Sequence, residues 1–429
     1  MVLTMTELHG PAEPSSAPHP PDLSRHVGRR PAIAAALLGA VSLAACGTQD
    51  PPAAGPTSAT NDAPSPTPPP EPTTPAASQT PSADPSSQSD ALEGWSLEEK
   101  VGQLIMVGVD ASAPAPASTS AVTEHHVGSI FVAGRSQASS QAIGQTIASI
   151  TGQAGERGRP MLVATDQEGG EVQVLSGSGF SQIPSALEQS KQSRDQLLAS
   201  AQQWGQELAE AGVTMNLAPV ADLVDIASPK DNGPIGAWGR EYGHDAATAS
   251  SQAIAFAEGM QAAGVIPTYK HFPGLGRVTD NTDTSANVID RSTSRTGDAA
   301  VGVFAEAIAA GAQVIMMSSA VYALIDDSTP AVFSSTIVTD MLRTEMGFTG
   351  VVITDDVSAA TQVQDWDPGE RAILAVRAGC DLVLASAEPS LAAPMAKALV
   401  EAAKKDTALA ARIDESARRI LALKATQPS

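Results

Sequence analysis

Polar side chains that could act in catalysis stand at the ends of three apolar runs in this 429-residue sequence. Asp166-Gln167-Glu168 ends the run "PMLVATDQ", Lys270-His271 lies at the end of "VIPTYKHFP", and Asp355-Asp356 ends "GVVITDD". Carboxylates can serve as nucleophiles or proton donors. One acid at the end of a strand is common by chance, but three polar clusters in equivalent places suggest a shared site.

Other reaction chemistries find little support in the sequence. It contains no G-x-S-x-G elbow and no cofactor motif, so no cofactor is expected. Beyond the leader the histidines are few, and we interpret His125, His126 and His244 as structural, which leaves His271 and predicts no metal site. The remaining hypothesis is two-carboxylate chemistry on a glycosidic bond, with one group as nucleophile and another as acid/base.

Elements that could position these residues follow from eight short apolar runs, each typical of a buried strand. The stretches between them carry helical periodicity and end in glycine, as connecting helices do. A capping box at Ser96 and Glu99 predicts the start of the first helix. The runs occupy residues 104–109, 127–134, 160–167, 212–220, 265–273, 313–319, 350–356 and 381–386.

Alternation of strands and helices is typical of α/β folds. A doubly wound sheet would also alternate, but eight units in about 330 residues favour a single (β/α)8 barrel of the TIM type. In such a barrel the carboxyl ends of all strands open onto one face. The three polar clusters are therefore expected to meet at that face.

The charge of the chain limits its partners. The formal net charge is −22 at pH 7. Nucleic acid and anionic lipid would be repelled at long range, so no nucleic acid partner is expected. A neutral or cationic ligand is easier to accommodate.

The first 92 residues predict export rather than catalysis. Basic residues precede the apolar run "AIAAALLGAVSLAAC", as in a secretory signal, and "LAAC" ending at Cys46 resembles a bacterial lipobox. We therefore expect a leader over residues 1–45 and lipidation of Cys46. Residues 46–92 are rich in Pro, Ser and Thr, which predicts a disordered linker that cannot form a core. The catalytic domain is expected over residues 93–429, lipid-anchored to the outer face of the cell membrane and facing the cell wall.

The motifs "DQEGG", "NLAPVADL", "KHFPGLG" and "ITDD" follow one another in an order that resembles glycoside hydrolase family 3. Within that family the sequence is similar to the NagZ-type β-N-acetylglucosaminidases, which consist of a single barrel. Actinobacterial LpqI-like lipoproteins share the lipobox, the Pro-rich spacer and the variant "KHFPGLGRVT". The resemblance covers residues 93 to about 425.

This resemblance implies roles for individual residues. Asp355 would be the nucleophile that forms a covalent glycosyl-enzyme with net retention. Lys270, His271, Asp166 and Arg240 would bind sugar hydroxyl groups. The neighbouring Asp356 is expected to be structural.

The sequence also departs from the family pattern. Glu171 and Val174 stand where the family has arginines, and the Asp-x-His dyad that supplies the family's acid/base falls here on Asn281 and Asp283. The dyad histidine is therefore absent. Asp283 is the favoured acid/base, if loop closure buries it and favours its protonated form, and Asp280 is the second candidate. A third possibility is that no group assists strongly.

The resemblance thus implies a retaining exo-β-N-acetylglucosaminidase that releases terminal β-linked GlcNAc from peptidoglycan fragments. The expected partners are GlcNAc-containing muropeptides and, through the lipid anchor alone, the membrane, with the protein acting as a monomer. The alternatives are a non-catalytic glycan-binding lipoprotein and another family 3 glycosidase such as a β-glucosidase. Release of the sugar to phosphate instead of water also stays open.

Overall fold

The computed structural model describes residues 91–155 and 160–427. These residues belong to one compact unit of the chain. The predicted leader, Cys46 and the linker as far as residue 90 lie outside the described residues. No helix within the described residues is long and apolar enough to cross a membrane.

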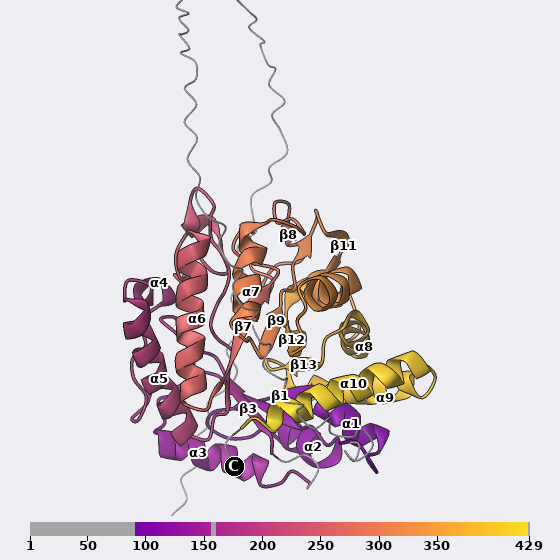
Figure 1. Cartoon of the computed structure of the whole chain (residues 1–429). Coiled ribbons are helices and arrows are strands. Elements are labelled where there is room, and N and C mark those ends of the chain that lie inside the picture. Colours follow the sequence, from indigo (N-terminus) through magenta and orange to yellow (C-terminus); the bar gives the residue numbers. More distant parts are fainter. Residues whose placement is uncertain (1–90, 156–159, 428–429) are drawn as a thin grey trace, which may run out of the picture. The chain divides into compact units, whose positions relative to one another are not determined.

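Eight parallel strands close into a barrel, which confirms the predicted (β/α)8 fold (Figure 1). Each strand pairs with its neighbours in chain order, and the last pairs with the first, Ile105 lying opposite Val383. Seven of the eight predicted apolar runs contain a whole barrel strand, and β1 extends one residue beyond the first run. The strands are β1 (Ile105–Asp110), β2 (Ser129–Ala133), β3 (Leu162–Thr165), β6 (Met215–Asn216), β7 (Ile266–Phe272), β9 (Val314–Met317), β12 (Val351–Asp356) and β13 (Leu382–Ala385).

Helices connect successive strands and cover the barrel (Figure 1). The predicted capping box is confirmed, because the Ser96 side chain accepts from the Glu99 N–H and the Glu99 side chain accepts from the Ser96 N–H. The helices are α1 (Leu97–Gln103), α2 (Pro116–Glu124), α3 (Ser140–Thr151), α4 (Ala186–Gln189), α5 (Arg194–Glu210), α6 (Ala246–Ala262), α7 (Ala299–Ala309), the π-helix η4 (Thr336–Glu345), α8 (Pro368–Ala378), α9 (Ala392–Ala403) and α10 (Thr407–Lys424).

Short elements beyond the barrel strands build the rim on the carboxyl side. One hairpin follows β3, and a three-stranded sheet gathers segments that follow β7 and β9. The 3-10 turn η5 (Thr361–Val363) follows β12 directly. The rim strands are β4 (Gln167–Gly169), β5 (Val172–Gln173), β8 (Ile289–Asp290), β10 (Val321–Tyr322) and β11 (Asp326–Pro330), and the other 3-10 turns are η2 (Pro229–Asp231), η3 (Ala331–Phe333) and η6 (Pro389–Leu391).

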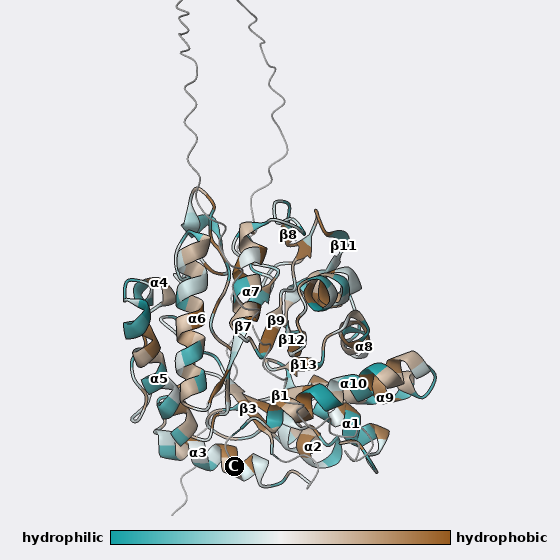
Figure 2. Cartoon of the chain, viewed as in Figure 1, coloured by the Kyte–Doolittle hydropathy of each residue, from teal (hydrophilic) through white to brown (hydrophobic). Residues whose placement is uncertain are grey.

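The core consists of the strands and the inner faces of the helices. Strands β3, β9 and β13 are buried along their whole length, as expected for parallel strands covered by helices. Figure 2 shows these central strands in apolar colours, whereas outer helices such as α5 and α10 carry hydrophilic stretches as well. Burial on both faces explains why the strand sequences read as continuous apolar runs.

A buried ion cluster closes the amino end of β13. Asp381, which is fully buried, accepts hydrogen bonds from Arg343 at 2.5 Å, from Arg412 at 2.6 Å and from Arg419 at 3.2 Å. The backbone N–H of Val352 also donates to this carboxylate, at 3.0 Å. Asp381 therefore ties three helical arginines to the end of the barrel opposite the strand carboxyl ends.

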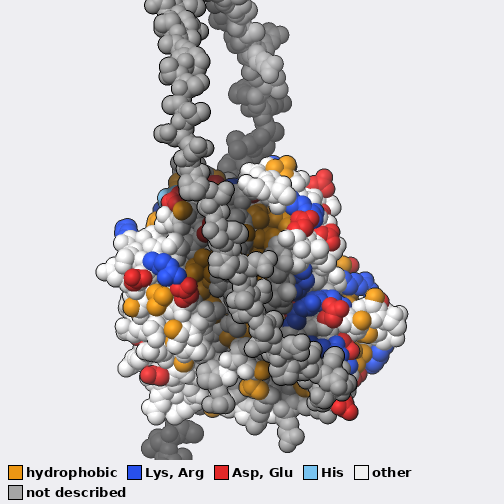
Figure 3. Space-filling model, in the orientation of Figure 1, with side chains coloured by type: hydrophobic (Ala, Val, Ile, Leu, Met, Phe, Trp, Pro, Cys, Tyr) orange, Lys and Arg blue, Asp and Glu red, His pale blue; other side chains and the backbone are white. Residues whose placement is uncertain are grey.

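Charged side chains on the face drawn in Figure 3 form small groups of both signs among polar and apolar side chains. Exposed ion pairs of the described residues include Lys191 with Glu188 and Arg377 with Asp406. Exposed pairs of this kind contribute little to stability, about 0–1 kcal/mol each.

Candidate active site

A cavity of about 310 Å³ opens at the carboxyl ends of the barrel strands. This volume is near the lower end of the range for small-molecule sites, about 300–1,000 Å³. All six residues that the sequence places in the site line this cavity. The lining residues are Phe131, Asp166, Val172, Leu217, Pro234, Arg240, Lys270, His271, Leu275, Asn281, Thr282, Asp283, Met316, Asp355, Asp356, Leu384, Ser386 and Ala387.

The surroundings of Asp355 in the cavity shift its pKa upward. Burial is the main reason that its pKa rises to about 6, and the negative charge of Asp283 raises the pKa further. His271 and Lys270 act in the opposite direction but do not cancel these effects. Asp355 therefore combines partial exposure to the cavity with an ionisation poised near neutral pH, as active-site groups often do.

A buried network of two cations and two acids forms one wall. The Lys270 ammonium lies 2.7 Å from Asp166 Oδ1 and 2.6 Å from Glu168 Oε1. Arg240 donates two hydrogen bonds to the same Glu168 carboxylate, from Nε at 2.9 Å and from Nη2 at 2.8 Å. The third nitrogen of Arg240 donates to the backbone oxygen of Pro234 at 2.9 Å. The network fixes both cations at the cavity.

Glu168 is the anion that makes this arrangement possible. Burial alone would raise its pKa, but Arg240 and Lys270 more than offset the burial, and the pKa of Glu168 falls to about 2. Burial likewise opposes the charge of Lys270, whose pKa is nevertheless raised because Asp166 and Glu168 stabilise the ammonium. Both partners thus stay ionised at neutral pH.

His271 is held by a second buried acid, Asp222. Its Nδ1 lies 2.7 Å from Asp222 Oδ2, and its backbone N–H donates to Asp222 Oδ1 at 3.0 Å. The backbone N–H of Leu275 donates to that same oxygen at 2.7 Å. Because a carboxylate only accepts, the proton on His271 lies on Nδ1, and Nε2 remains for the cavity.

Irregular strand pairing allows neighbouring residues to share the cavity. Successive residues of a regular strand point to opposite faces. The pairing of β7 with β9 shifts register between Tyr269 and Phe272, and the pairing of β12 with β13 shifts between Ile353 and Asp356. These shifts occur where Lys270 and His271, and Asp355 and Asp356, all line the cavity. Such irregularities are common beside active sites.

Asp356 differs from Asp355 in its hydrogen bonds. Its carboxylate accepts from the hydroxyl of Ser358 at 2.7 Å, from the N–H of Ala359 at 3.1 Å and from the N–H of Ser386 at 2.9 Å. Asp355 accepts only the N–H of Asp356, at 2.9 Å, among the hydrogen bonds of the described residues. The geometry makes Asp356 a brace between the ends of β12 and β13.

The segment that carries Asp283 reaches over the cavity from β7. Asn281, Thr282 and Asp283 line the cavity, whereas the exposed Asp280 does not. Of the two acids considered for the proton donor, only Asp283 therefore faces the same space as Asp355.

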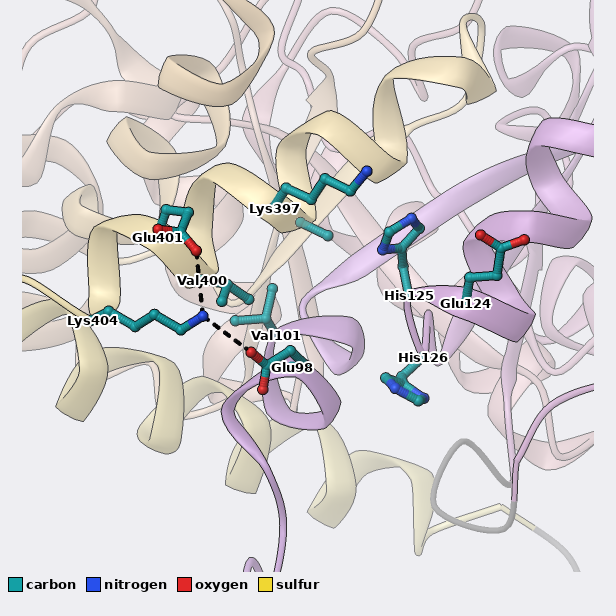
Figure 4. A pocket seen from close by; sticks show the side chains of 10 residues that line it. Glu98, Val101, Glu124, His125, His126, Lys397, Val400, Glu401 and Lys404 are labelled. Atoms are coloured by element: carbon teal, nitrogen blue, oxygen red, sulfur yellow. Dashed lines mark hydrogen bonds and ion pairs between the residues drawn. The ribbon is translucent and has the colours of Figure 1, made fainter.

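A second pocket, of about 380 Å³, lies at the opposite side of the barrel strands and is lined by His125 and His126 (Figure 4). Its walls come from α1, α9 and the segment between α2 and β2. Lys404 bridges Glu98 and Glu401 at 3.3 Å each, and His125 and His126 face the same space. No group of three or more potential metal ligands is found among residues 91–155 and 160–427.

The sequence assigned no role to two acids that hold the cations and the histidine of the site: Glu168, noted only as a member of the cluster after the third run, and Asp222. Glu168 lies in "DQEGG" and Asp222 in "NLAPVADL", so both motifs contained a signal. Which acid of a motif turns inward depends on local pairing, which the sequence alone does not give.

Comparison with known proteins supports a common ancestry over nearly the whole described region. The family model for the glycosyl hydrolase family 3 N terminal domain matches residues 96–423. A secreted glycosyl hydrolase of Arthroderma benhamiae is 35% identical over 273 residues, which cover 62% of this chain and 75% of the relative. A β-hexosaminidase of Stenotrophomonas maltophilia is 33% identical over 233 residues, which cover 53% and 67%.

Solved structures resemble the barrel closely. The β-N-acetylhexosaminidase from Beutenbergia cavernae superimposes with a TM-score of 0.76 at 52% identity and covers 77% of this chain and 98% of that one. LpqI of M. tuberculosis superimposes with a TM-score of 0.67 at 28% identity and covers 78% and 95%.

Proposed function

The chain belongs to glycosyl hydrolase family 3, and from this membership we propose that it is a retaining exo-β-N-acetylglucosaminidase. The observation that carries the proposal is one cavity that presents two carboxylates, Asp355 and Asp283, beside a fixed Lys270 and His271. The similarity to proteins described as β-hexosaminidase and β-N-acetylhexosaminidase supports the choice of sugar.

In the proposed first step Asp355 attacks the anomeric carbon while Asp283 gives its proton to the glycosidic oxygen. The carbon–oxygen bond to the leaving group breaks, and an ester bond to Asp355 forms. In the second step Asp283, now a carboxylate, takes a proton from water, and the water oxygen displaces Asp355 from the anomeric carbon. The sugar leaves with its original configuration, and both carboxyl groups return to their starting states.

We assign the binding of sugar hydroxyl groups to Lys270, His271, Asp166 and Arg240. Their ionised partners support this role, because a cation fixed by buried carboxylates presents its remaining donors in one direction. His271 would offer the Nε2 lone pair to a hydroxyl hydrogen. Preorganised contacts of this kind cost no rearrangement when the sugar enters.

The substrate we propose is a peptidoglycan fragment with a terminal β-linked GlcNAc. This rests on the predicted export signal, the predicted lipidation of Cys46 and the linker, which together would hold the barrel near the cell wall. We propose that the protein acts there as a monomer. A membrane-tethered enzyme at that location meets muropeptides, and the acidic surface does not favour polyanionic polymers.

Covalent trapping tests the mechanism. The full chain is incubated with a fluorinated glycosyl fluoride that forms the ester but hydrolyses slowly, and the labelled peptide is identified by mass spectrometry. Label on Asp355 is the expected result. A protein that binds the sugar but acquires no label would be a glycan-binding protein instead. Digestion of defined muropeptides in phosphate buffer then separates GlcNAc from GlcNAc-1-phosphate among the products, and GlcNAc is expected.

A further inference from the structure

The segment that carries Asp283 is bonded to the turn that leaves the strand of Asp355. We propose that Thr361 is a positioning residue that fixes Asp283 over the cavity, an inference that rests on the proposed acid/base role of Asp283. Thr361 lies in η5, six positions after Asp355, and does not line the cavity. It would therefore act through Asp283 and not by touching the sugar.

Two hydrogen bonds join Thr361 to the backbone of Asp283. The Thr361 hydroxyl donates to the Asp283 backbone oxygen at 2.8 Å, and the Thr361 N–H donates to the same oxygen at 3.1 Å. The neighbouring N–H of Gln362 donates to the backbone oxygen of Thr282 at 3.0 Å. Both lone pairs of the Asp283 carbonyl are thus engaged by one residue.

The side chains on either side of this contact fix the rest of the segment. The amide of Asn232, which is fully buried, donates to the backbone oxygens of Leu275 at 2.9 Å and Val278 at 2.7 Å. Beyond Asp283, Gln362 accepts the N–H of Val288 at 2.7 Å. The segment is therefore anchored before and after the acid.

Arg277 provides a further anchor near the start of the segment. Its guanidinium is held by Asp225 at 2.7 Å on one side and by Asp298 at 2.9 Å on the other. Between these anchors Thr361 supplies the side-chain hydrogen bond to the Asp283 carbonyl, beside the backbone hydrogen bonds from the N–H groups of Thr361 and Gln362. If Asp283 is held in place before the substrate arrives, the segment that carries it need not close over the sugar. The carboxyl group is then already aligned with the glycosidic oxygen.

The test compares leaving groups, because a proton donor matters most when the leaving group is poor. Full-length Thr361→Val, Thr361→Ser and Asp283→Asn are assayed on a dinitrophenyl β-N-acetylglucosaminide and on a β-linked GlcNAc disaccharide. Thr361→Val removes the hydroxyl donor and keeps the N–H and the side-chain volume. Thr339→Val is the matched control, since the Thr339 hydroxyl donates to the Ala378 backbone oxygen at 2.7 Å, far from the cavity lining.

Thr361→Val is expected to lower kcat on the disaccharide about tenfold, the effect of one lost hydrogen bond, while kcat on the activated substrate stays within about twofold. Thr361→Ser restores the disaccharide rate, and Thr339→Val leaves the ratio of the two rates unchanged. If Thr361→Val does not fold, Thr361→Ala provides the same comparison.

Three results would overturn the inference in different ways. If Asp283→Asn changes the ratio of rates and Thr361→Val does not, Asp283 keeps its role and Thr361 is not its positioning residue. If Asp283→Asn also leaves the ratio unchanged, the acid/base assignment fails, and the role of Thr361 fails with it. An equal loss on both substrates in Thr361→Val likewise indicates a purely structural effect.

Discussion

Asp222 holds His271 through both its ring and its backbone: Oδ2 lies 2.7 Å from Nδ1, and Oδ1 accepts the main-chain N–H at 3.0 Å. The carboxylate thereby sets the orientation of the ring and the nitrogen that carries the proton. A residue outside the cavity lining thus determines what His271 presents to a ligand.

Replacing Asp222 by Asn tests this relationship. The amide group would face Nδ1 as a donor, so the proton of His271 would move to Nε2 and the cavity would lose an acceptor. We expect kcat/KM to fall about 10- to 100-fold, as for the loss of a hydrogen bond to a charged group. Asp381→Asn, which alters a buried carboxylate at the other end of the barrel, is the control and should lower stability without changing kcat/KM.

Glu168→Gln should lower the stability of the fold. The substitution removes the anion that Lys270 and Arg240 share, and it leaves two buried cations incompletely paired. Breaking a buried pair typically costs about 3–5 kcal/mol, so the free energy of unfolding measured in urea should fall by that order. Glu171→Gln is the matched control, because its pair with Arg135 is exposed and 4.0 Å long, and little change is expected there.

The acid limb of the pH–rate profile should depend on Asp283. Asp355 must be ionised to attack, so kcat/KM on the activated substrate should rise as pH increases through about 6, the raised pKa of Asp355. Asp283→Asn removes a charge that raises this pKa, and the limb should therefore move to lower pH. A limb that stays in place would show that the two carboxyl groups are not coupled, and a limb that moves to higher pH would contradict the expected sign of the coupling.

Asp355→Asn should stabilise the fold while abolishing turnover. Because the pKa of Asp355 is about 6 in the fold and 3.8 in an unperturbed chain, the folded state binds the proton more tightly than the unfolded state. Stability from this group is present below pH 4 and is lost as pH rises through about 6. The Asn variant avoids that loss, so its free energy of unfolding at pH 7 should be higher by about 1–2 kcal/mol. The gain is smaller than the full pKa shift would give, because water in the cavity screens part of the effect. At pH 4 the gain should disappear, which thermal unfolding at both values would check.

The architecture could be predicted because local patterns carry it. Continuous apolar runs mark strands that are buried on both faces, and Ser96 with Glu99 marks a helix start through bonds between near neighbours. The order of the runs then gave the barrel, since parallel strands with helical connections follow one another around it.

The site could be predicted in part. Asp166, Lys270, His271 and Asp355 stand at strand ends, so their meeting at one face follows from the fold. The closure of loops does not follow from it. Asp283 is exposed in an anchored segment, and the expectation that burial on loop closure favours its protonated form stays a prediction.

The sequence by itself determined the strand and helix order, the family and the face at which the polar residues gather. Only the tertiary structure decided which acid pairs with which partner. Glu168 pairs with Lys270 and Arg240, and Asp222 pairs with His271. The reason is physical. Periodicity and capping are local properties of the chain, whereas the pairing of buried charges joins residues about 50 to 100 positions apart and depends on strand register and burial.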